Sequence, residues 1–262
     1  MTASSPNPGS TFTPGELAGF GYSLPVDQPL YPKPPVIYQD TTILMYTYET
    51  DAAAARKLLP RQLDLDGGPV QVRMIFADYG FSSYGAYIEV AQAISCFYKG
   101  HEYNYPVRLH VTSDRAMASG REIGGFPKKI GDIRFHKGAE YLCTLDSPPG
   151  LRVCSALLAP KTMLTDSYSN VALYASLRLI PNFDLSAPDG HPSLCQLLET
   201  SWEMMGGQLW DATGNVNLTG ASELDPYHHL PVVKPLTCNL YIGKMQISKI
   251  RLLEDLTPTA SK

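Results

Sequence analysis

The chain has 262 residues, of which 44% are hydrophobic and 18% are charged, and its formal net charge at pH 7 is −4. These values exclude an intrinsically disordered chain and are typical of one globular domain, with two small domains as the alternative. No run of Lys and Arg forms a nucleic-acid patch and no window is apolar for long enough to span a bilayer, so we expect neither a nucleic-acid partner nor a membrane segment.

The first predicted element is a proline-rich arm over residues 1–35, which we expect to be extended and partly disordered at its start. We expect a single domain over residues 36–256 and a short tail over residues 257–262 to follow it. The arm lacks a basic segment followed by an apolar one, so we expect no secretory signal. The five cysteines are widely spaced without a C-x-x-C motif, which predicts reduced thiols in a cytoplasmic protein and no structural zinc site.

A strand, a helix and a second strand are predicted at the start of the domain. We expect the first strand at Thr42–Tyr48 and a helix at Asp51–Leu59, with Thr50 as its N-cap and Pro60 at its end. Residues alternate along the next predicted strand, Val70–Ala77, so that Val70, Val72, Met74 and Phe76 share one face and Gln71, Arg73, Ile75 and Ala77 the other.

Two more strands are predicted before the middle of the chain. Residues 84–98 are rich in aromatic and β-branched side chains, which favours a long strand. Alternation returns at residues 107–111, where Arg108 and His110 face away from the apolar side.

A short helix and a series of strands complete the prediction. Ser113 is expected to cap a helix of one or two turns, which Gly120 ends. Residues 193–202 fit a helix and a strand equally well. The remaining strands are predicted at residues 130–136, 141–146, 151–158, 173–180, 208–218 and 236–251. Because strands outnumber helices and turns are frequent, we expect an α+β fold dominated by a curved antiparallel sheet or barrel, with a few short helices.

Several common catalytic motifs are absent from the chain. There is no P-loop and no G-x-G-x-x-G motif after a strand, and Gly80 and Gly85 are one position too far apart for a G-x-S-x-G elbow. His228 and His229 are adjacent and lack carboxylate-rich surroundings, which favours a surface loop over a metal site. We therefore expect neither a metal nor a cofactor.

The most informative segment is Gly120–Gly131, which contains the pair Lys128 and Lys129. A pair of lysines is usually solvated, but here Phe126-Pro127 precede it and an apolar strand follows, so Lys128 is predicted to enter the interior. Burial of an ammonium group is costly, and an interior lysine therefore tends to release its proton. The neutral amine is the form that attacks a ketone. Because successive strand residues point to opposite faces, Lys129 should not enter beside Lys128.

The sequence G-R-E-I-G-G-F-P-K-K-I-G at residues 120–131 resembles the motif of the acetoacetate decarboxylase family, an established example of nucleophilic catalysis by lysine. Further similarity is found at residues 56–60, 85–94, 151–153, 180–183 and 230–232, so that it covers nearly all of the chain from Tyr31 to Leu253. The resemblance implies a curved antiparallel sheet around an interior pocket, and assembly into a homo-oligomer.

The resemblance also implies roles for individual residues. Lys128 corresponds to the Schiff-base lysine of the family, Lys129 to the second lysine that helps to keep it neutral, and Glu89 to the active-site glutamate. The expected substrate-binding residues are Arg73, Arg121, Glu122 and Phe126. A simpler interpretation of Arg121 and Glu122 is a buried pair that shapes the loop.

One difference from the family concerns the substrate. Family decarboxylases carry an arginine at the start of the first strand, near the substrate carboxylate, whereas this chain has Asp40-Thr41-Thr42 there. Arg73 lies at or beside the place of a further family glutamate. It would either supply a cation from a new direction or lie on the outer face of its strand.

The resemblance implies a lyase that decarboxylates a β-keto acid through an iminium on Lys128, without a cofactor. The missing arginine favours an alternative within the same fold: aldol condensation, dehydration or cyclisation of a larger, polyketide-like carbonyl substrate of secondary metabolism. A non-catalytic protein that binds small ketones or acids, with Lys128 as a charged anchor, is a further alternative.

Overall fold

The computed structural model describes residues 23–25, 27–184 and 191–258. The predicted disordered start of the arm and the last four residues of the tail lie outside these ranges. The helices are α2 (Ala52–Arg56), α3 (Asp114–Glu122) and the 3-10 helix η3 (Tyr227–His229). The strands are β1 (Val36–Thr50), β2 (Val70–Ser82), β3 (Tyr87–Tyr98), β4 (His101–Val111), β5 (Lys128–Ile130), β6 (Asp132–Lys137), β7 (Tyr141–Asp146), β8 (Arg152–Thr165), β9 (Ser169–Ile180), β10 (Leu194–Asn217) and β11 (Lys234–Asp255).

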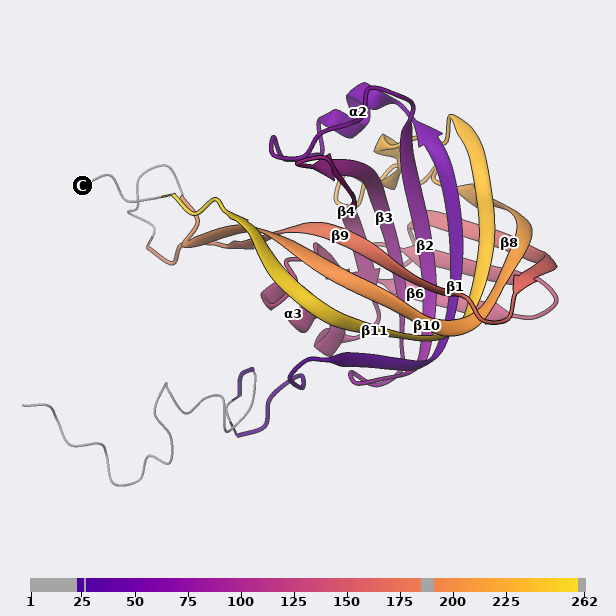
Figure 1. The fold of residues 1–262 in the computed structure, drawn as a ribbon, viewed down its shortest axis with the longest axis horizontal. Helices are drawn as coiled ribbons and strands as arrows, with labels where there is room; N and C mark the ends of the chain where they lie inside the picture. Colours follow the sequence, from indigo (N-terminus) through magenta and orange to yellow (C-terminus); the bar gives the residue numbers. More distant parts are fainter. Residues whose placement is uncertain (1–22, 26, 185–190, 259–262) are drawn as a thin grey trace, which may run out of the picture.

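Pairing between β10 and β11 closes seven of the strands into a barrel. Their order is β11-β1-β2-β3-β4-β9-β10, and β8, β7 and β6 continue the sheet from β10. The long strands β10 and β11 run side by side along the molecule (Figure 1). The predicted fold, a mainly antiparallel curved sheet or barrel with few helices, is therefore confirmed.

The barrel has one weak seam. Neighbouring strands are joined by long ladders everywhere except between β4 and β9, which meet through a single parallel pair, Asn104 and Tyr174. The short strand β5 pairs in parallel with the other end of β4. The segment that contains the lysine pair therefore lies at the end of the strand that borders this seam.

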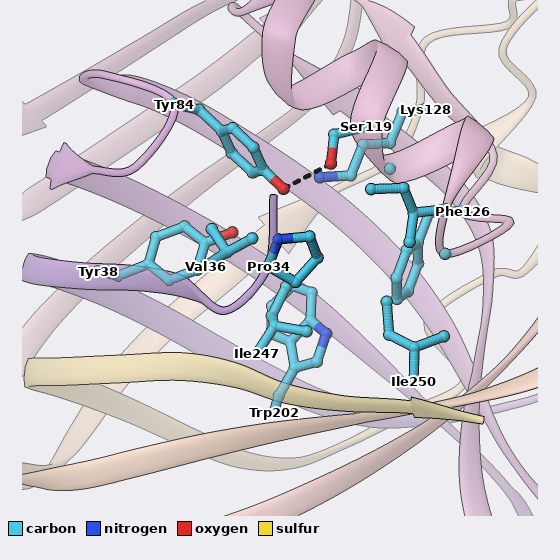
Figure 2. Close-up of a pocket in the computed structure, with 13 residues that line it drawn as sticks. Pro34, Val36, Tyr38, Tyr84, Ser119, Phe126, Lys128, Trp202, Ile247 and Ile250 are labelled. Carbon is cyan, nitrogen blue, oxygen red and sulfur yellow. Dashed lines mark hydrogen bonds between the residues drawn. The ribbon is translucent and has the colours of Figure 1, made fainter. Parts of the chain in front are cut away.

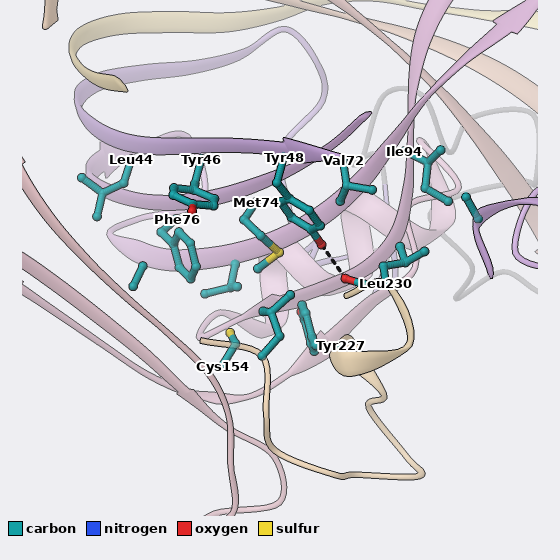
Figure 3. Packing of buried hydrophobic residues seen from close by; sticks show 14 of the residues in the cluster. Leu44, Tyr46, Tyr48, Val72, Met74, Phe76, Ile94, Cys154, Tyr227 and Leu230 are labelled. Atoms are coloured by element: carbon teal, nitrogen blue, oxygen red, sulfur yellow. Dashed lines mark hydrogen bonds between the residues drawn. The ribbon is translucent and has the colours of Figure 1, made fainter. Parts of the chain in front are cut away.

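Alternation along the strands divides the buried side chains into two clusters. On β2, Ile75 and Ala77 belong to an inner cluster with residues from all seven barrel strands. Val72 and Met74 belong to an outer cluster, which packs the outside of the barrel against β7 and β8 (Figure 3). The two faces predicted for this strand are therefore confirmed, and side chains on both of them are buried.

Three helix boundaries differ from the prediction, and one of them is the end of α2, which lies at Arg56 instead of Leu59. The N-cap of α2 is Asp51, whose Oδ1 accepts a hydrogen bond from the Ala54 amide at 2.7 Å, and the predicted cap Thr50 instead donates to the Pro231 carbonyl at 2.9 Å. Ser113 caps α3 as predicted, but this helix continues past Gly120 to Glu122. The glycine serves for close packing against a side chain rather than as a helix stop.

Several strands are longer than predicted. Of the ambiguous segment, residues 194–202 are in a strand, and they join residues 208–217 in the single strand β10. The join lies at Gly206 and Gly207, where the ladder with β11 shifts its register and both glycines have positive φ. The two glycines thus form an irregularity within one strand.

Candidate active site

Helix α3 and strand β5 together position Lys128. This residue begins β5, pairs with Leu109 of β4, and is 4% exposed. Gly120 of α3 lies directly against its side chain: a Cβ atom at this position would be 2.5 Å from Cδ of Lys128. The first glycine of the motif therefore makes room for the methylene chain that reaches into the barrel.

Gly124 and Gly125 allow the loop before β5 to pack closely against β9 at the seam of the barrel. Gly125 has a φ of +68°, and a Cβ atom there would lie 2.5 Å from the backbone nitrogen of Arg178 on β9. Ser176 of β9 also donates a hydrogen bond to the Gly124 carbonyl at 2.5 Å. The loop is thus hydrogen-bonded to β9 in a region where β4 does not pair with that strand. It also positions Phe126 in the inner cluster.

Inside the barrel, Lys128 forms a buried ion pair with Glu89. Its Nζ lies 2.9 Å from Oε2 of Glu89, and the two side chains are 5% and 0% exposed. Among the described residues, no group hydrogen-bonds to the other carboxylate oxygen, Oε1. A buried acceptor without a partner is uncommon, and it leaves one oxygen of Glu89 available to a substrate or a water molecule.

Three tyrosines surround the Glu89 side of the site. The ring of Tyr79 lies 4.6 Å from that of Tyr38 and 4.8 Å from that of Tyr87, between centroids. Burial raises the pKa of all three hydroxyl groups well above the usual value, and the charge of Glu89 adds to this effect. The tyrosines therefore stay neutral and can act only as hydrogen-bonding groups.

A mostly apolar pocket opens beside the Lys128 side chain (Figure 2). Its free volume is about 30 Å³, so a bound ketone would require neighbouring side chains to move. The polar groups in its wall include the amine of Lys128 and the hydroxyl groups of Tyr84 and Ser119, which hydrogen-bond to each other at 2.5 Å. Tyr38 and Trp202 also line the pocket, and the indole nitrogen of Trp202 has no hydrogen-bond partner among the described residues. The apolar side chains in the wall are those of Pro34, Val36, Ile123, Phe126, Ile247 and Ile250.

Lys129 points to the opposite face of β5, as alternation predicted. Its side chain is half exposed, and its Nζ lies 2.8 Å from Oδ1 of Asp225 and 2.9 Å from the Leu224 carbonyl. The charge of Lys129 is thus balanced outside the barrel. Its assigned role of keeping Lys128 neutral remains a prediction.

Asp225 lies at the centre of a buried polar cluster behind β4. Burial alone would raise the pKa of its carboxyl group, but hydrogen bonds from Lys129 and Ser147 hold it below the usual value. His110 of β4 lies 3.2 Å from the same carboxylate, and burial lowers the pKa of its imidazole. The cluster fastens the backbone that carries Lys128 from the side away from the pocket.

Three predicted substrate-binding residues lie outside this pocket. Arg73 is on the inner face of β2, but it donates to Oδ1 of Asn104 at 2.9 Å and does not line the pocket. Arg121 and Glu122 are exposed, so the expected buried pair is wrong. Arg121 donates to the Lys128 carbonyl at 3.2 Å, whereas Glu122 accepts a hydrogen bond from Tyr31. Of the four predicted substrate-binding residues, Phe126 lines the pocket.

Sequence reasoning did not identify Tyr84, Ser119 or Trp202 as pocket residues. The aromatic residues around Tyr84 could be identified in the sequence, but no neighbouring residue indicated that the Tyr84 hydroxyl group would contact α3. Trp202 lies in the segment whose secondary structure was ambiguous.

Within residues 23–25, 27–184 and 191–258, no three His, Cys, Asp or Glu side chains are grouped so that they could hold a metal ion. No helix in these same ranges is sufficiently long and apolar to cross a bilayer.

Comparison with known proteins relates the chain to decarboxylases. The model of the acetoacetate decarboxylase (ADC) family matches residues 23–256. The chain is 28% identical to Decarboxylase DEC1 of Cochliobolus heterostrophus over 213 residues, which cover 79% of this chain and 83% of that protein. It is 29% identical to an acetoacetate decarboxylase of Clostridium botulinum over 245 residues, or 89% and 90% of the two chains. A solved acetoacetate decarboxylase structure has the same fold, with a TM-score of 0.81 and 23% identity over 94% of this chain and 100% of that one.

Proposed function

The chain belongs to the acetoacetate decarboxylase family, and from this premise we propose that it is a lyase that decarboxylates a β-keto acid through an iminium on Lys128. One observation carries the proposal. Lys128 lines an apolar pocket, and its amine lies 2.9 Å from the buried carboxylate of Glu89. This arrangement supports Lys128 as the nucleophile and Glu89 as the group that takes its proton, away from bulk water.

The first half of the reaction forms the iminium. Glu89 takes a proton from Lys128, and the neutral amine attacks the ketone carbon of the substrate. A proton moves from nitrogen to oxygen to give a carbinolamine. Glu89 then returns its proton to the hydroxyl group, which leaves as water, and a positively charged iminium remains opposite the negative charge of Glu89.

The second half uses the iminium as an electron sink. The electron pair of the bond to the carboxylate moves into the iminium, carbon dioxide leaves, and a neutral enamine remains. A proton from water, relayed through Glu89, restores an iminium at the product. Water then hydrolyses this iminium, which releases the ketone and returns Lys128 as an ammonium group. The unpartnered Oε1 atom of Glu89 supports its place in this relay. The sequence of steps needs no cofactor.

Trapping with borohydride tests the proposal. The protein is mixed with a panel of ketones and β-keto acids and reduced, and the adduct is located by intact mass and peptide mapping. We expect a stable adduct on Lys128 and release of carbon dioxide from the β-keto acids. The absence of an adduct with every member of the panel would favour the non-catalytic binding protein instead.

A second candidate uses the same iminium without loss of carbon dioxide. In the described part of the chain, the pocket wall contains no cation besides Lys128. Aldol condensation, dehydration or cyclisation of a larger carbonyl compound needs no cation for a carboxylate, and this observation favours such a reaction. An adduct on Lys128 without release of carbon dioxide from any β-keto acid would support this candidate.

Family membership also supports a proposal about assembly, namely that the chain forms a homo-oligomer. Apolar side chains near the end of β9 are exposed, among them Leu179 at 49% and Phe183 at 93%. We expect them to be covered by a second copy. Light scattering after size-exclusion chromatography measures the mass, and a monomer at micromolar concentration would contradict the proposal.

A further inference from the structure

The hydroxyl groups of Tyr84 and Ser119 form a preorganised pair in the pocket wall. Tyr84 comes from the turn between β2 and β3, and Ser119 comes from the middle of α3. The two residues are 7% and 3% exposed, and their oxygen atoms are 2.5 Å apart. Figure 2 shows the pair on the same side of the pocket as the Lys128 amine.

The turn around Tyr84 is fixed by its own hydrogen bonds. Oγ of Ser82 accepts from the Tyr84 amide at 3.1 Å and donates to the Gly85 carbonyl at 2.6 Å. The tyrosine ring is therefore held in position before any ligand arrives, which is the condition for a selective polar contact.

The pair has one hydrogen-bond donor to spare. Two hydroxyl groups carry two hydrogens, and the bond between Tyr84 and Ser119 uses one of them. No other hydrogen bond of either side chain is found in the described part of the chain. Burial raises the pKa of Tyr84, although the bond to Ser119 opposes this, so the pair keeps both hydrogens at neutral pH. The remaining hydrogen is available to an oxygen atom in the pocket.

The charges of the site determine which oxygen this is. In the proposed reaction, Lys128 is bound to the ketone carbon, and Glu89 is negatively charged once it has given its proton to the ketone oxygen. The carboxylate of a β-keto acid is then repelled by Glu89 and needs a donor elsewhere. Besides Lys128, the donors in the wall of the described pocket are the hydroxyl groups of Tyr84, Ser119 and Tyr38 and the indole nitrogen of Trp202. Of these, Tyr84 and Ser119 lie beside the Lys128 amine (Figure 2).

We propose that Tyr84 and Ser119 form a carboxylate subsite, and that the pocket takes β-keto acids whose other substituent is an alkyl chain. This inference rests on the proposed function. The alkyl chain would lie against Trp202, Ile247 and Ile250, which form the apolar end of the pocket. Neutral donors hold a carboxylate less tightly than a cation does, so less binding energy is lost when the carboxylate becomes uncharged carbon dioxide.

The test compares β-ketohexanoate with methyl propyl ketone, which is the same molecule without its carboxylate. The apparent affinity of each ligand is measured by borohydride trapping on Lys128 over a series of concentrations, with the acid sampled before appreciable conversion, and intact mass separates the adduct that keeps the carboxylate from the adduct of the ketone. Neither measurement requires turnover. The variants are Tyr84→Phe, Ser119→Ala and the combination of the two. Tyr98→Phe is the matched control, because its hydroxyl group contacts the Leu253 carbonyl and not the pocket.

We expect the double variant Tyr84→Phe/Ser119→Ala, which removes both hydroxyl hydrogens, to weaken binding of the acid about tenfold, as for a lost hydrogen bond to a charged group. Each single variant leaves one hydroxyl hydrogen in the wall and should lose less, and binding of the ketone should change less than about twofold in all three. An equal loss for both ligands, or no loss for the acid, would overturn the subsite. Failure of the unmodified protein to trap the ketone would instead overturn the proposed function, so the two failures are distinguishable.

Discussion

The amine of Lys128 and the carboxylate of Glu89 lie 2.9 Å apart inside a barrel, where both side chains are buried. The two residues come from strands β5 and β3, which do not pair with each other, and both bond to β4 between them. One strand therefore sets the distance between the amine and the carboxylate. Four predictions follow from this arrangement and from the structures that support it.

Replacement of Lys128 should abolish turnover. Lys128→Ala removes the amine, and Lys128→Arg keeps a cation beside Glu89 but cannot release its proton. We expect both variants to show the uncatalysed rate of carbon dioxide release and no borohydride adduct. Measurable turnover by a pure Lys128→Ala preparation would contradict amine catalysis at this residue.

Replacement of Glu89 should separate catalysis from stability. Glu89→Gln keeps a hydrogen-bonding group beside Lys128 but cannot accept a proton, and kcat should fall about 100- to 10,000-fold. Glu89→Ala leaves a buried ammonium group without a partner, and the free energy of unfolding should fall by about 3–5 kcal/mol. Urea unfolding measures the second effect, with the exposed Glu102→Gln as a control. Equal kcat values for Glu89→Gln and the unmodified protein would exclude Glu89 as the base.

The contribution of Asp225 should depend on pH. Its pKa is lowered in the folded protein, so its contribution is fully present above the unfolded value of 3.8 and is lost as the pH falls through the folded value. Asp225→Asn removes charge-assisted bonds to Lys129 and should lower the free energy of unfolding at pH 7 by about 1–3 kcal/mol. Unfolding curves between pH 3 and pH 7 measure the difference. A difference that grows towards pH 3 would contradict the prediction.

Gly125→Ala should destabilise the barrel seam. An alanine at a φ of +68° is strained by about 1–2 kcal/mol, and its Cβ would overlap the backbone of Arg178. We expect a total loss of about 2–4 kcal/mol, measured by thermal or urea unfolding. Gly100→Ala is the matched control, because Gly100 has a φ of +82° and open space around its Cβ position. Equal losses for the two variants would show that the contact with β9 carries no energy.

Periodicity in the sequence was sufficient to predict the local features of the site. Alternation placed Lys128 and Lys129 on opposite faces of a strand, and the structure shows this. The glycines of the motif could be identified in the sequence, but the contacts that require them could not. Gly120 lies within α3, and the Lys128 side chain packs where a Cβ atom of residue 120 would lie. Such contacts depend on which segments meet after folding.

The contacts of the site that could not be predicted from the sequence join segments that are far apart in the chain. Tyr84 and Ser119 are 35 positions apart and meet across a turn and a helix. Lys129 and Asp225 are 96 positions apart. The same reasoning explains the incorrect expectation for Arg121 and Glu122, since their exposure depends on how α3 packs rather than on their neighbours in the chain.

The single bridge between β4 and β9 also has a consequence for motion. The barrel should open locally along the seam between β4 and β9, because fewer backbone hydrogen bonds must break there than between the other neighbouring strands. Amide hydrogens of the loop 123–127 should therefore exchange with solvent sooner than those of the β1–β2 ladder. The lysine motif adjoins this line, so fluctuations that loosen the seam would also widen its small pocket. The route by which a ligand enters and the least stable part of the barrel would then be the same place.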